Sequence, residues 1–184
     1  LINNIAVAAM AAVRRYGLKR VAVIDWDVHH GNGTQAIFDG HPELLHVSVH
    51  QYPHYPGTGA AADTGQLGNL LNIPLAPGSG DAEYRGVFRE QVLPAVRRFA
   101  PELILVSAGY DGHGADPLSA MRLSVTGYAE MTAMVKALAA ECCAGRLVLL
   151  LEGGYHHKAL AASVAAAFSV LLEEPYDDPL GGKF

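Results

Sequence analysis

Four short runs of Val, Leu and Ile constrain the fold of this chain more than any other feature of its sequence. They span Arg20–Ile24, Leu44–Val49, Leu103–Val106 and Leu147–Leu151, and a weaker fifth run covers Leu70–Leu75. Apolar runs of this length without polar alternation are typical of strands buried on both faces of a parallel sheet. We therefore expect an α/β fold with a mainly parallel sheet.

Helical patterns fill the intervals between these runs. We expect helices over Ile2–Tyr16, from Asp81 to about Phe99, from Ser124 or Thr126 to about Ala144, and over Lys158–Leu172. Gly17 is placed to end the first helix, and Pro94 should bend or split the second. The glycine-rich stretch from Gly57 to Gly80 is predicted to be mostly irregular and to form walls of a site.

The length and composition indicate one compact domain. The chain has 184 residues, a formal net charge of −5, 51% hydrophobic residues and 17% charged residues, a balance opposite to that of disordered chains. Its few Lys and Arg residues are scattered and form no basic cluster for nucleic acid. No apolar run reaches the roughly 18 residues that a membrane span needs. We expect neither a nucleic-acid nor a membrane partner, and the sequence does not define an oligomeric state.

The cysteines and the first residue bear on the origin of the chain. Cys142 and Cys143 are neighbours, and Cα atoms about 3.8 Å apart are too close for an ordinary disulfide. Free thiols and the lack of a signal-peptide pattern predict a reducing compartment and a cytoplasmic location. The chain begins at Leu1 without a methionine, which suggests a piece of a longer protein.

Each of the four main apolar runs leads directly into polar residues. These polar segments are Asp25–Thr34, Ser48–Tyr52, Ser107–His113 and Glu152–His157. In an open α/β sheet, ligands bind beyond the carboxyl ends of the strands. The sequence therefore predicts a site at that edge, to which four segments contribute carboxylates, imidazoles and a phenol.

The first of these segments has the residues of a metal site. Alternation along an extended chain places Asp25, Asp27 and His29 on one side. Carboxylates that converge at a buried strand end are costly without a positive partner, and a Zn²⁺ or related divalent ion held by Asp27, His29 and Asp111 would supply one. We expect Asp25 to support this site, either by bonding backbone amides or by binding a second cation.

Other polar residues near the strand ends have simpler interpretations. His41, His46 and His54 are interpreted as loop or rim histidines, Asp116 as a turn residue before Pro117, and His156 and His157 as exposed residues at a helix start. Tyr155 differs, because the two glycines before it let the backbone approach a ligand closely.

The segment Gly31–Ala36 also fits the loose dinucleotide-binding pattern G-x-G-x-x-A. Two aspartates at the same strand end would repel a pyrophosphate, and the second strand ends without an acidic partner for the ribose. Gly31 and Gly33 are therefore interpreted as allowing a tight turn around the metal site.

Four ordered motifs resemble the zinc-dependent histone deacetylase superfamily, which includes acetylpolyamine amidohydrolases and acetoin-utilisation proteins. The motifs are DWDVHHGNGT at Asp25–Thr34, YPGTG at Tyr55–Gly59, AGYD at Ala108–Asp111 with the DPL of Asp116–Leu118, and EGGY at Glu152–Tyr155. The resemblance extends from Leu1 to about Leu172. Asn32 stands where some members of the family have Asp, and in this respect the chain resembles the class II-like bacterial branch. It implies a three-layer αβα fold of the arginase/deacetylase type. Residues 1–184 would be the C-terminal portion of one such domain, incomplete at the N-terminus, with residues 173–184 as a trailing tail.

The resemblance also implies roles for individual residues. Asp27, His29 and Asp111 would hold Zn²⁺. Asp25, Ser48 and Val49 would bind a monovalent cation such as K⁺. Tyr155 would donate a hydrogen bond to the substrate carbonyl, and Tyr55, Gly109 and Gly154 would contribute to the substrate site. The substrate would be an acetylated lysine or a small acetylated amine such as an acetylpolyamine.

The implied reaction is hydrolysis of an acetyl amide by metal-activated water, which needs a general base. The family supplies that base with a His-His pair upstream of the position of Asn3, and His30 cannot replace it because alternation turns it away from the metal. The chain by itself is therefore expected to be inactive. Two alternatives remain: a binuclear manganese ureohydrolase-like enzyme and a protein that binds acyl-lysine without hydrolysis.

Overall fold

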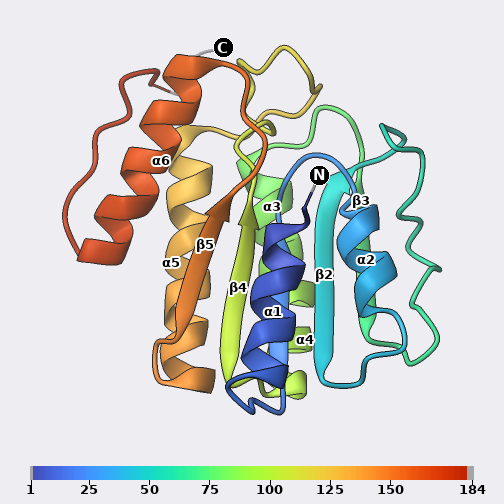
Figure 1. Cartoon of the computed structure of the whole chain (residues 1–184). Coiled ribbons are helices and arrows are strands. Elements are labelled where there is room, and N and C mark those ends of the chain that lie inside the picture. The colour runs from blue at the N-terminus through green and yellow to red at the C-terminus, as the bar shows by residue number, and fades with distance from the viewer. Residues whose placement is uncertain (1, 182–184) are drawn as a thin grey trace.

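The computed structural model describes residues 2–181 and contains a five-stranded, all-parallel sheet (Figure 1). The strands are β1 (Val21–Asp25), β2 (Leu44–Gln51), β3 (Leu70–Leu75), β4 (Leu103–Ala108) and β5 (Leu147–Leu151), in the spatial order β3-β2-β1-β4-β5. The expected fold class is confirmed, because all five strands lie where the apolar runs predicted them. Their ends differ from the prediction by no more than two residues.

Helices cover both faces of the sheet and complete three layers. One face carries α1 (Asn4–Arg14) and α2 (Asn32–Phe38), and the other carries α3 (Asp81–Val87), a π-helical segment η1 (Phe88–Val92), α4 (Leu93–Phe99) and α5 (Val125–Cys143). The last helix, α6 (His157–Leu172), packs against α5. The chain thus forms a helix–sheet–helix sandwich.

The alternation of β1 divides the core into two halves. Val21 and Val23 pack with α1 and α2, whereas Ala22 and Ile24 pack with the helices of the opposite face. All five residues of β1 are buried, because this strand is the middle one of the five and is covered on both sides. The sequence of β1 therefore contains no polar alternation until the strand ends at Asp25.

Two local features differ in how well the sequence anticipated them. Pro94 interrupts the helical stretch as expected: the π-helical segment lies just before it, and α4 has the proline in its first turn. The tight turn expected at Gly31 is present, because the Asn32 amide donates to the His30 carbonyl at 2.8 Å. The turn does not extend to Gly33, which lies inside α2, a helix that buries Thr34 and Phe38.

Register aligns the polar strand ends. Asp25 lies opposite Ser48 of β2 on one side and opposite Ser107 of β4 on the other. Parallel strands that end together place everything that follows them at one edge of the sheet. The segment after β1 is therefore next to the segments after β2 and β4, as the strand-end pattern predicted.

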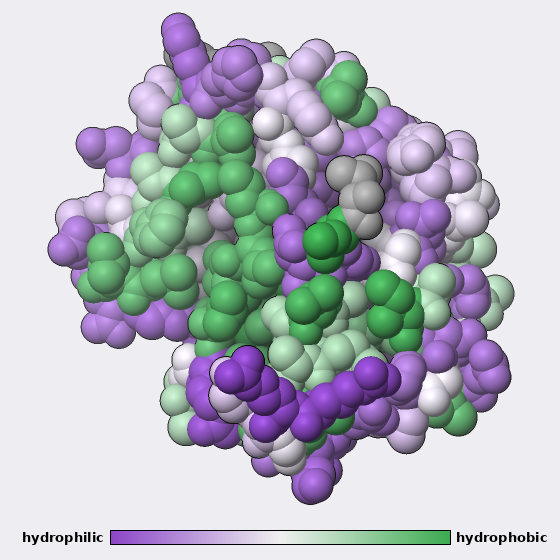
Figure 2. All heavy atoms as spheres, viewed as in Figure 1, coloured by the Kyte–Doolittle hydropathy of each residue, from purple (hydrophilic) through white to green (hydrophobic). Residues whose placement is uncertain are grey.

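The β5 edge of the sheet is open to solvent. Its sequence, LVLLL, is entirely apolar, yet Val148 is 47% and Leu151 is 61% exposed. Phe168 of α6 is also exposed, and a groove of about 340 Å³ runs between β5 and α6. Figure 2 shows the apolar area that these elements form on this face of the molecule.

The C-terminal segment beyond α6 is partly packed. Tyr176 and Leu180 contact a small cluster that includes Val125 and Ala166, while residues 182–184 of the expected tail lie outside the described residues. Cys142 and Cys143 are free thiols. None of the described helices has the length and apolar character needed to cross a membrane.

The central position of β1 leads to a prediction about stability. Replacing the fully buried Ile24 by Ala should lower the free energy of unfolding by about 2–5 kcal/mol, because it removes apolar contacts and leaves a cavity. Ile37 of α2 is 40% exposed, so Ile37→Ala should change stability by less than about 1 kcal/mol. Urea unfolding of both variants would measure this, and equal losses would contradict the two-sided burial of β1.

Candidate metal centre

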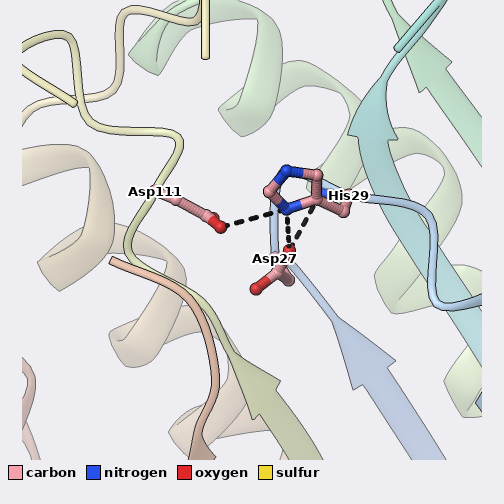
Figure 3. Close-up of side chains that lie close together, drawn as sticks. All are labelled: Asp27, His29 and Asp111. Carbon is pink, nitrogen blue, oxygen red and sulfur yellow. Dashed lines mark hydrogen bonds and ion pairs between the residues drawn. The ribbon is translucent and has the colours of Figure 1, made fainter. Parts of the chain in front are cut away.

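Asp27, His29 and Asp111 come together at the carboxyl edge of the sheet (Figure 3). Asp27 and His29 follow the end of β1, and Asp111 follows the end of β4, the neighbouring strand. One potential ligand atom from each residue lies within 4.8 Å of the other two. The three residues that the sequence predicted to lie close together therefore do so.

Backbone amides hold the two carboxylates in place. The Gly153 amide donates to one oxygen of Asp27 at 2.9 Å, and the Val28 amide donates to one oxygen of Asp111 at 2.9 Å. The other oxygens face His29 Nδ1, at 2.9 Å for Asp27 and 3.2 Å for Asp111. Each carboxylate thus has one anchored oxygen and one oxygen directed at the centre of the group.

The electrostatics of this group call for a positive charge. Hydrogen bonds from His29 to Asp111 and Asp27 raise the pKa of the imidazole to about 10, so a proton on the ring neutralises part of the carboxylate charge. Burial raises the pKa of Asp111, whose fully buried Oδ2 has the ion pair with His29 Nδ1 at 3.2 Å. Two carboxylates and one imidazole fit a divalent cation, which would replace that proton and take the carboxylate oxygens that face His29 as ligands.

Two glycines leave the space in which the carboxylates lie. A Cβ atom at Gly109 would overlap the side chain of Asp27, and a Cβ atom at Gly153 would overlap the carboxylate of Asp111. Gly109, expected to contribute to the substrate site, therefore lies against a candidate metal ligand. Gly154 has φ +143°, a conformation that favours glycine, and faces Leu160 rather than the carboxylates.

Asp25 lies beside the candidate metal group in a buried position of its own. One oxygen of Asp25 accepts from the Asp27 amide at 3.1 Å, and the other lies 3.5 Å from His46 Nε2. Burial, together with the nearby Asp27 charge, raises the pKa of Asp25 well above its usual range. His46 is 1% exposed, so its interpretation as a loop or rim histidine is wrong. It lies within β2 because a run of apolar neighbours carries it into the core.

The neighbouring residues Ser48 and Val49 of β2 have contacts of their own. Ser48 Oγ lies 2.9 Å from His50 Nδ1, and Val49 has a fully buried side chain. His30 is bonded through both ring nitrogens, to Thr58 and to Gln35, at 2.8 Å each. The Thr58 contact places His30 against the glycine-rich loop.

Two tyrosines border the metal group on different sides. Tyr155 lines a pocket of about 600 Å³ together with Asp27, His29 and Glu152, and its side chain is 49% exposed. Partial burial and the charges of Asp111 and Asp27 raise the pKa of its phenol. Tyr55 is 77% exposed and lies edge-on to His29, with ring centroids 6.1 Å apart. His54 stacks on the same imidazole at 5.1 Å.

Sequence reasoning missed two residues that shape this site. Gly153 donates its amide to Asp27 and leaves the space that the Asp111 carboxylate fills, whereas the sequence predicts a role for its neighbour Gly154. Asp116 was interpreted as a turn residue and does accept from the Leu118 amide, but its second oxygen accepts from the Tyr155 amide. The turn motif itself carries no signal for that second contact, which joins residues 39 positions apart.

Comparison with known proteins places the chain in a family. The sequence model of the family described as "Histone deacetylase domain" matches residues 1–171, and the chain therefore belongs to this family. The observed sheet and flanking helices agree with the deacetylase fold of the solved relatives.

Individual relatives are similar over nearly the whole chain. "Histone deacetylase 14, chloroplastic" of Arabidopsis thaliana is 46% identical over 187 residues, which cover all of this chain and 44% of that protein. "Polyamine deacetylase HDAC10" of Mus musculus is 40% identical over 191 residues, which cover 98% of this chain and 28% of that protein. The crystal structure of the HDA15 HD domain superimposes with a TM-score of 0.88 at 40% identity, over 99% of this chain and 52% of that one. The chain thus spans about half the length of these relatives or less.

The role of Gly153 can be tested by metal binding. Gly153→Ala should displace the Asp111 carboxylate and reduce zinc affinity at least about tenfold, as losses in the surroundings of metal ligands do. Gly86→Ala is the matched control, because a Cβ at this helical position meets nothing within 4 Å. Calorimetric titration of the metal-free chain with Zn²⁺ would measure both. Unchanged affinity in Gly153→Ala would contradict the arrangement described.

Proposed function

We propose that the protein is a zinc-dependent deacetylase that hydrolyses an acetyl amide. The observation that carries this proposal is the convergence of Asp27, His29 and Asp111 beside a pocket that Asp27, His29 and Tyr155 line. A bound Zn²⁺ would supply Lewis acidity, which polarises a carbonyl and acidifies a water molecule. Family membership supports the same reaction class.

In this proposal Asp27 and Asp111 act as ligands whose orientation is fixed before substrate arrives. Their anchoring by the Gly153 and Val28 amides leaves one oxygen of each directed at the centre. His29 would contribute its Nδ1 lone pair after losing the proton that it shares with the carboxylates. Preorganised ligands of this kind require little rearrangement during the reaction.

Tyr155 would act as a hydrogen-bond donor to the substrate carbonyl oxygen. A phenol with an ordinary pKa of about 10 already keeps its proton at neutral pH, and the raised pKa of Tyr155 acts in the same direction. A donor of this kind stabilises the negative charge that develops on that oxygen as water adds. The half-exposed position of the side chain at the pocket leaves the hydroxyl accessible to a substrate.

We further propose a monovalent cation such as K⁺ near Asp25. Asp25 and Ser48 are direct neighbours across β1 and β2, and Val49 follows on the same strand. The burial of Asp25 beside Asp27, which raises the pKa of its carboxyl, supports a positive charge next to it. This cation would stiffen the strand ends below the zinc ligands.

The substrate would be an acetylated lysine or a small acetylated amine such as an acetylpolyamine. Both present an acetyl amide at the end of a flexible aliphatic chain, which suits the exposed aromatic ring of Tyr55 beside His29. Gly109 and Gly154 would let the backbone approach the acyl group. The printed names of the relatives include both a histone and a polyamine deacetylase.

The presence of one group of possible metal ligands among the described residues favours the deacetylase reaction over that of a binuclear ureohydrolase. Within residues 2–181, the one cluster of three possible metal ligands is Asp27, His29 and Asp111. A second ion would need further carboxylates close to Asp111, and His113 does not join the cluster. The structure thus supports a mononuclear site.

We also propose that residues 1–184 form the C-terminal portion of a larger deacetylase domain. A strand composed of LVLLL is typical of the interior of a parallel sheet, yet β5 is at the edge with exposed side chains. Crossover connections in such sheets are right-handed. Because α1 lies on the same face as α2, a strand leading into α1 would lie on the side of β1 opposite to β2. The β4 and β5 positions are taken, so that strand would pair with the free edge of β5.

The general base would then come from outside the chain. His29 faces the two carboxylates, and His30 has both ring nitrogens occupied by Thr58 and Gln35. We propose that a His-His pair in the preceding part of the parent protein takes the proton of the water.

A reducing cytoplasmic compartment would match the two free thiols.

The role of Tyr155 leads to a prediction for the full-length gene product. Tyr155→Phe should lower kcat for an acetyl-lysine peptide about 10²-fold or more, while bound zinc stays at the wild-type level. Tyr16→Phe, exposed at the end of α1, is the control and should have wild-type kcat. Full activity of Tyr155→Phe would count against the deacetylase mechanism, and binding of acetyl-lysine without turnover by the wild type would favour a non-catalytic binding protein.

A second prediction concerns the β5 edge and the missing base. The 184-residue chain should bind zinc but show no turnover, and its outward-facing β5 amides should exchange hydrogen rapidly. In the full-length protein the same amides should be protected because an added strand accepts or donates hydrogen bonds there. Turnover by the 184-residue chain at ordinary enzyme rates, or equal exchange of β5 in both proteins, would overturn this view.

A further inference from the structure

Asp116 makes contacts that a turn residue does not need. Its side chain is buried, at 6% exposure, and one oxygen accepts from the Leu118 amide at 3.0 Å as expected of an aspartate turn. The other oxygen accepts from the Tyr155 amide at 2.7 Å and from the His156 amide at 3.2 Å. A buried carboxylate with three amide donors is well satisfied and hence strongly fixed in position.

The contact partners of Asp116 lie at the point where Tyr155 needs support. The Tyr155 side chain is about half-exposed, so packing alone does not define its direction. Its backbone follows Gly153 and Gly154, two residues with the widest backbone freedom. Beyond it, His156 begins α6 by accepting from the Ala159 amide. The Asp116 carboxylate therefore restrains the junction between a flexible glycine pair and a rigid helix.

The same short segment also carries Asp111. The backbone between these residues is tightly bonded, with the Asp116 amide donating to His113 at 2.8 Å and the His113 amide donating to Tyr110 at 3.4 Å. The Ser119 hydroxyl donates to the Asp111 carbonyl at 2.6 Å. The β4–α5 loop and the β5–α6 loop meet at the carboxyl edge of the sheet in Figure 1. One rigid segment thus holds a candidate metal ligand and restrains the backbone of Tyr155.

We propose that Asp116 is a positioning residue for Tyr155. By holding the Tyr155 and His156 amides, it fixes the distance between the phenol and the Asp111 side of the metal group. The hydrogen bonds described for the Asp116 side chain go only to backbone amides and not to Asp27, His29, Asp111 or the Tyr155 phenol. Asp116 therefore acts on Tyr155 through the backbone. The inference rests on the proposed deacetylase function, in which Tyr155 donates to the substrate carbonyl.

Two substitutions and a control test this role. Asp116→Ala removes all three acceptor contacts, whereas Asp116→Asn keeps one amide oxygen that can still accept from Tyr155. Asp178 accepts from the Leu180 and Gly181 amides in a comparable turn, and the hydrogen bonds described for it include none to Tyr155 or His156, which makes Asp178→Ala the matched control.

Hydrogen exchange of the zinc-loaded 184-residue chain is the first readout. In Asp116→Ala the Tyr155 and His156 amides should exchange about tenfold faster or more, as expected from losing hydrogen bonds to a charged group. The amides of β1 and β4 should keep wild-type rates. Asp116→Asn should lie between Asp116→Ala and the wild type, and Asp178→Ala should leave the Tyr155 amide unchanged.

Kinetics of the full-length gene product is the second readout. Asp116→Ala should lower kcat at least about tenfold, with KM and zinc content within about twofold of the wild type, and Asp116→Asn should recover part of kcat. An unchanged exchange rate of the Tyr155 amide would overturn the positioning role. So would a fall in zinc content together with a higher KM and faster exchange of the β-strand amides, because these changes would indicate a general structural defect. A wild-type protein without deacetylase activity would instead overturn the proposed function, while the exchange measurement would still decide whether Asp116 restrains Tyr155.

Discussion

The arrangement of the protein depends on the placement of two carboxylates beside one imidazole at the end of a buried strand. Asp27 and Asp111 repel each other in a partly desolvated position, and the proton on His29 offsets only part of that cost. The surrounding chain is built to accept them: Gly109 and Gly153 leave space, and the Gly153 and Val28 amides donate hydrogen bonds. A divalent cation between the carboxylates would replace their repulsion by attraction. The Gly153 and Val28 amides would then serve to hold two ligands in place for that cation.

The parallel sheet makes that placement possible. Side-by-side strands β1 and β4 end at the same level, so segments that are far apart in sequence deliver Asp27 and Asp111 to one edge. Buried strands on either side fix the register, because a slip of one residue would send each side chain of β1 into the opposite half-core, where it would meet different neighbours. The glycine pair after β5 then brings Tyr155 to the pocket, and Asp116 from the β4–α5 loop restrains it.

Much of the sheet and of the metal group could be predicted from the sequence. The predictions that failed did so for physical reasons. The strands were predictable because apolar runs buried on both faces have few alternative structures, and the proximity of Asp27 and Asp111 follows from parallel strand ends. The helix α2 was missed because glycines around its start favour a turn, while the burial of Phe38 that stabilises it is a tertiary effect. The burial of His46 and the second contact of Asp116 depend on partners distant in sequence, which no local pattern records. The identity of the metal and the roles of Asp25, Tyr55 and Tyr155 stay predictions.

The central claim is that one zinc ion binds to two carboxylates and one imidazole. X-ray absorption at the zinc edge of the protein loaded with one equivalent of Zn²⁺ tests it most directly. The account predicts a first shell of nitrogen and oxygen only, at about 2.0–2.2 Å, with the outer-shell scattering of a single imidazole. That imidazole signal should be absent in His29→Ala and retained in His41→Ala. Sulfur scattering at about 2.3 Å, which would implicate Cys142 or Cys143, or the signal of two or more imidazoles would contradict it.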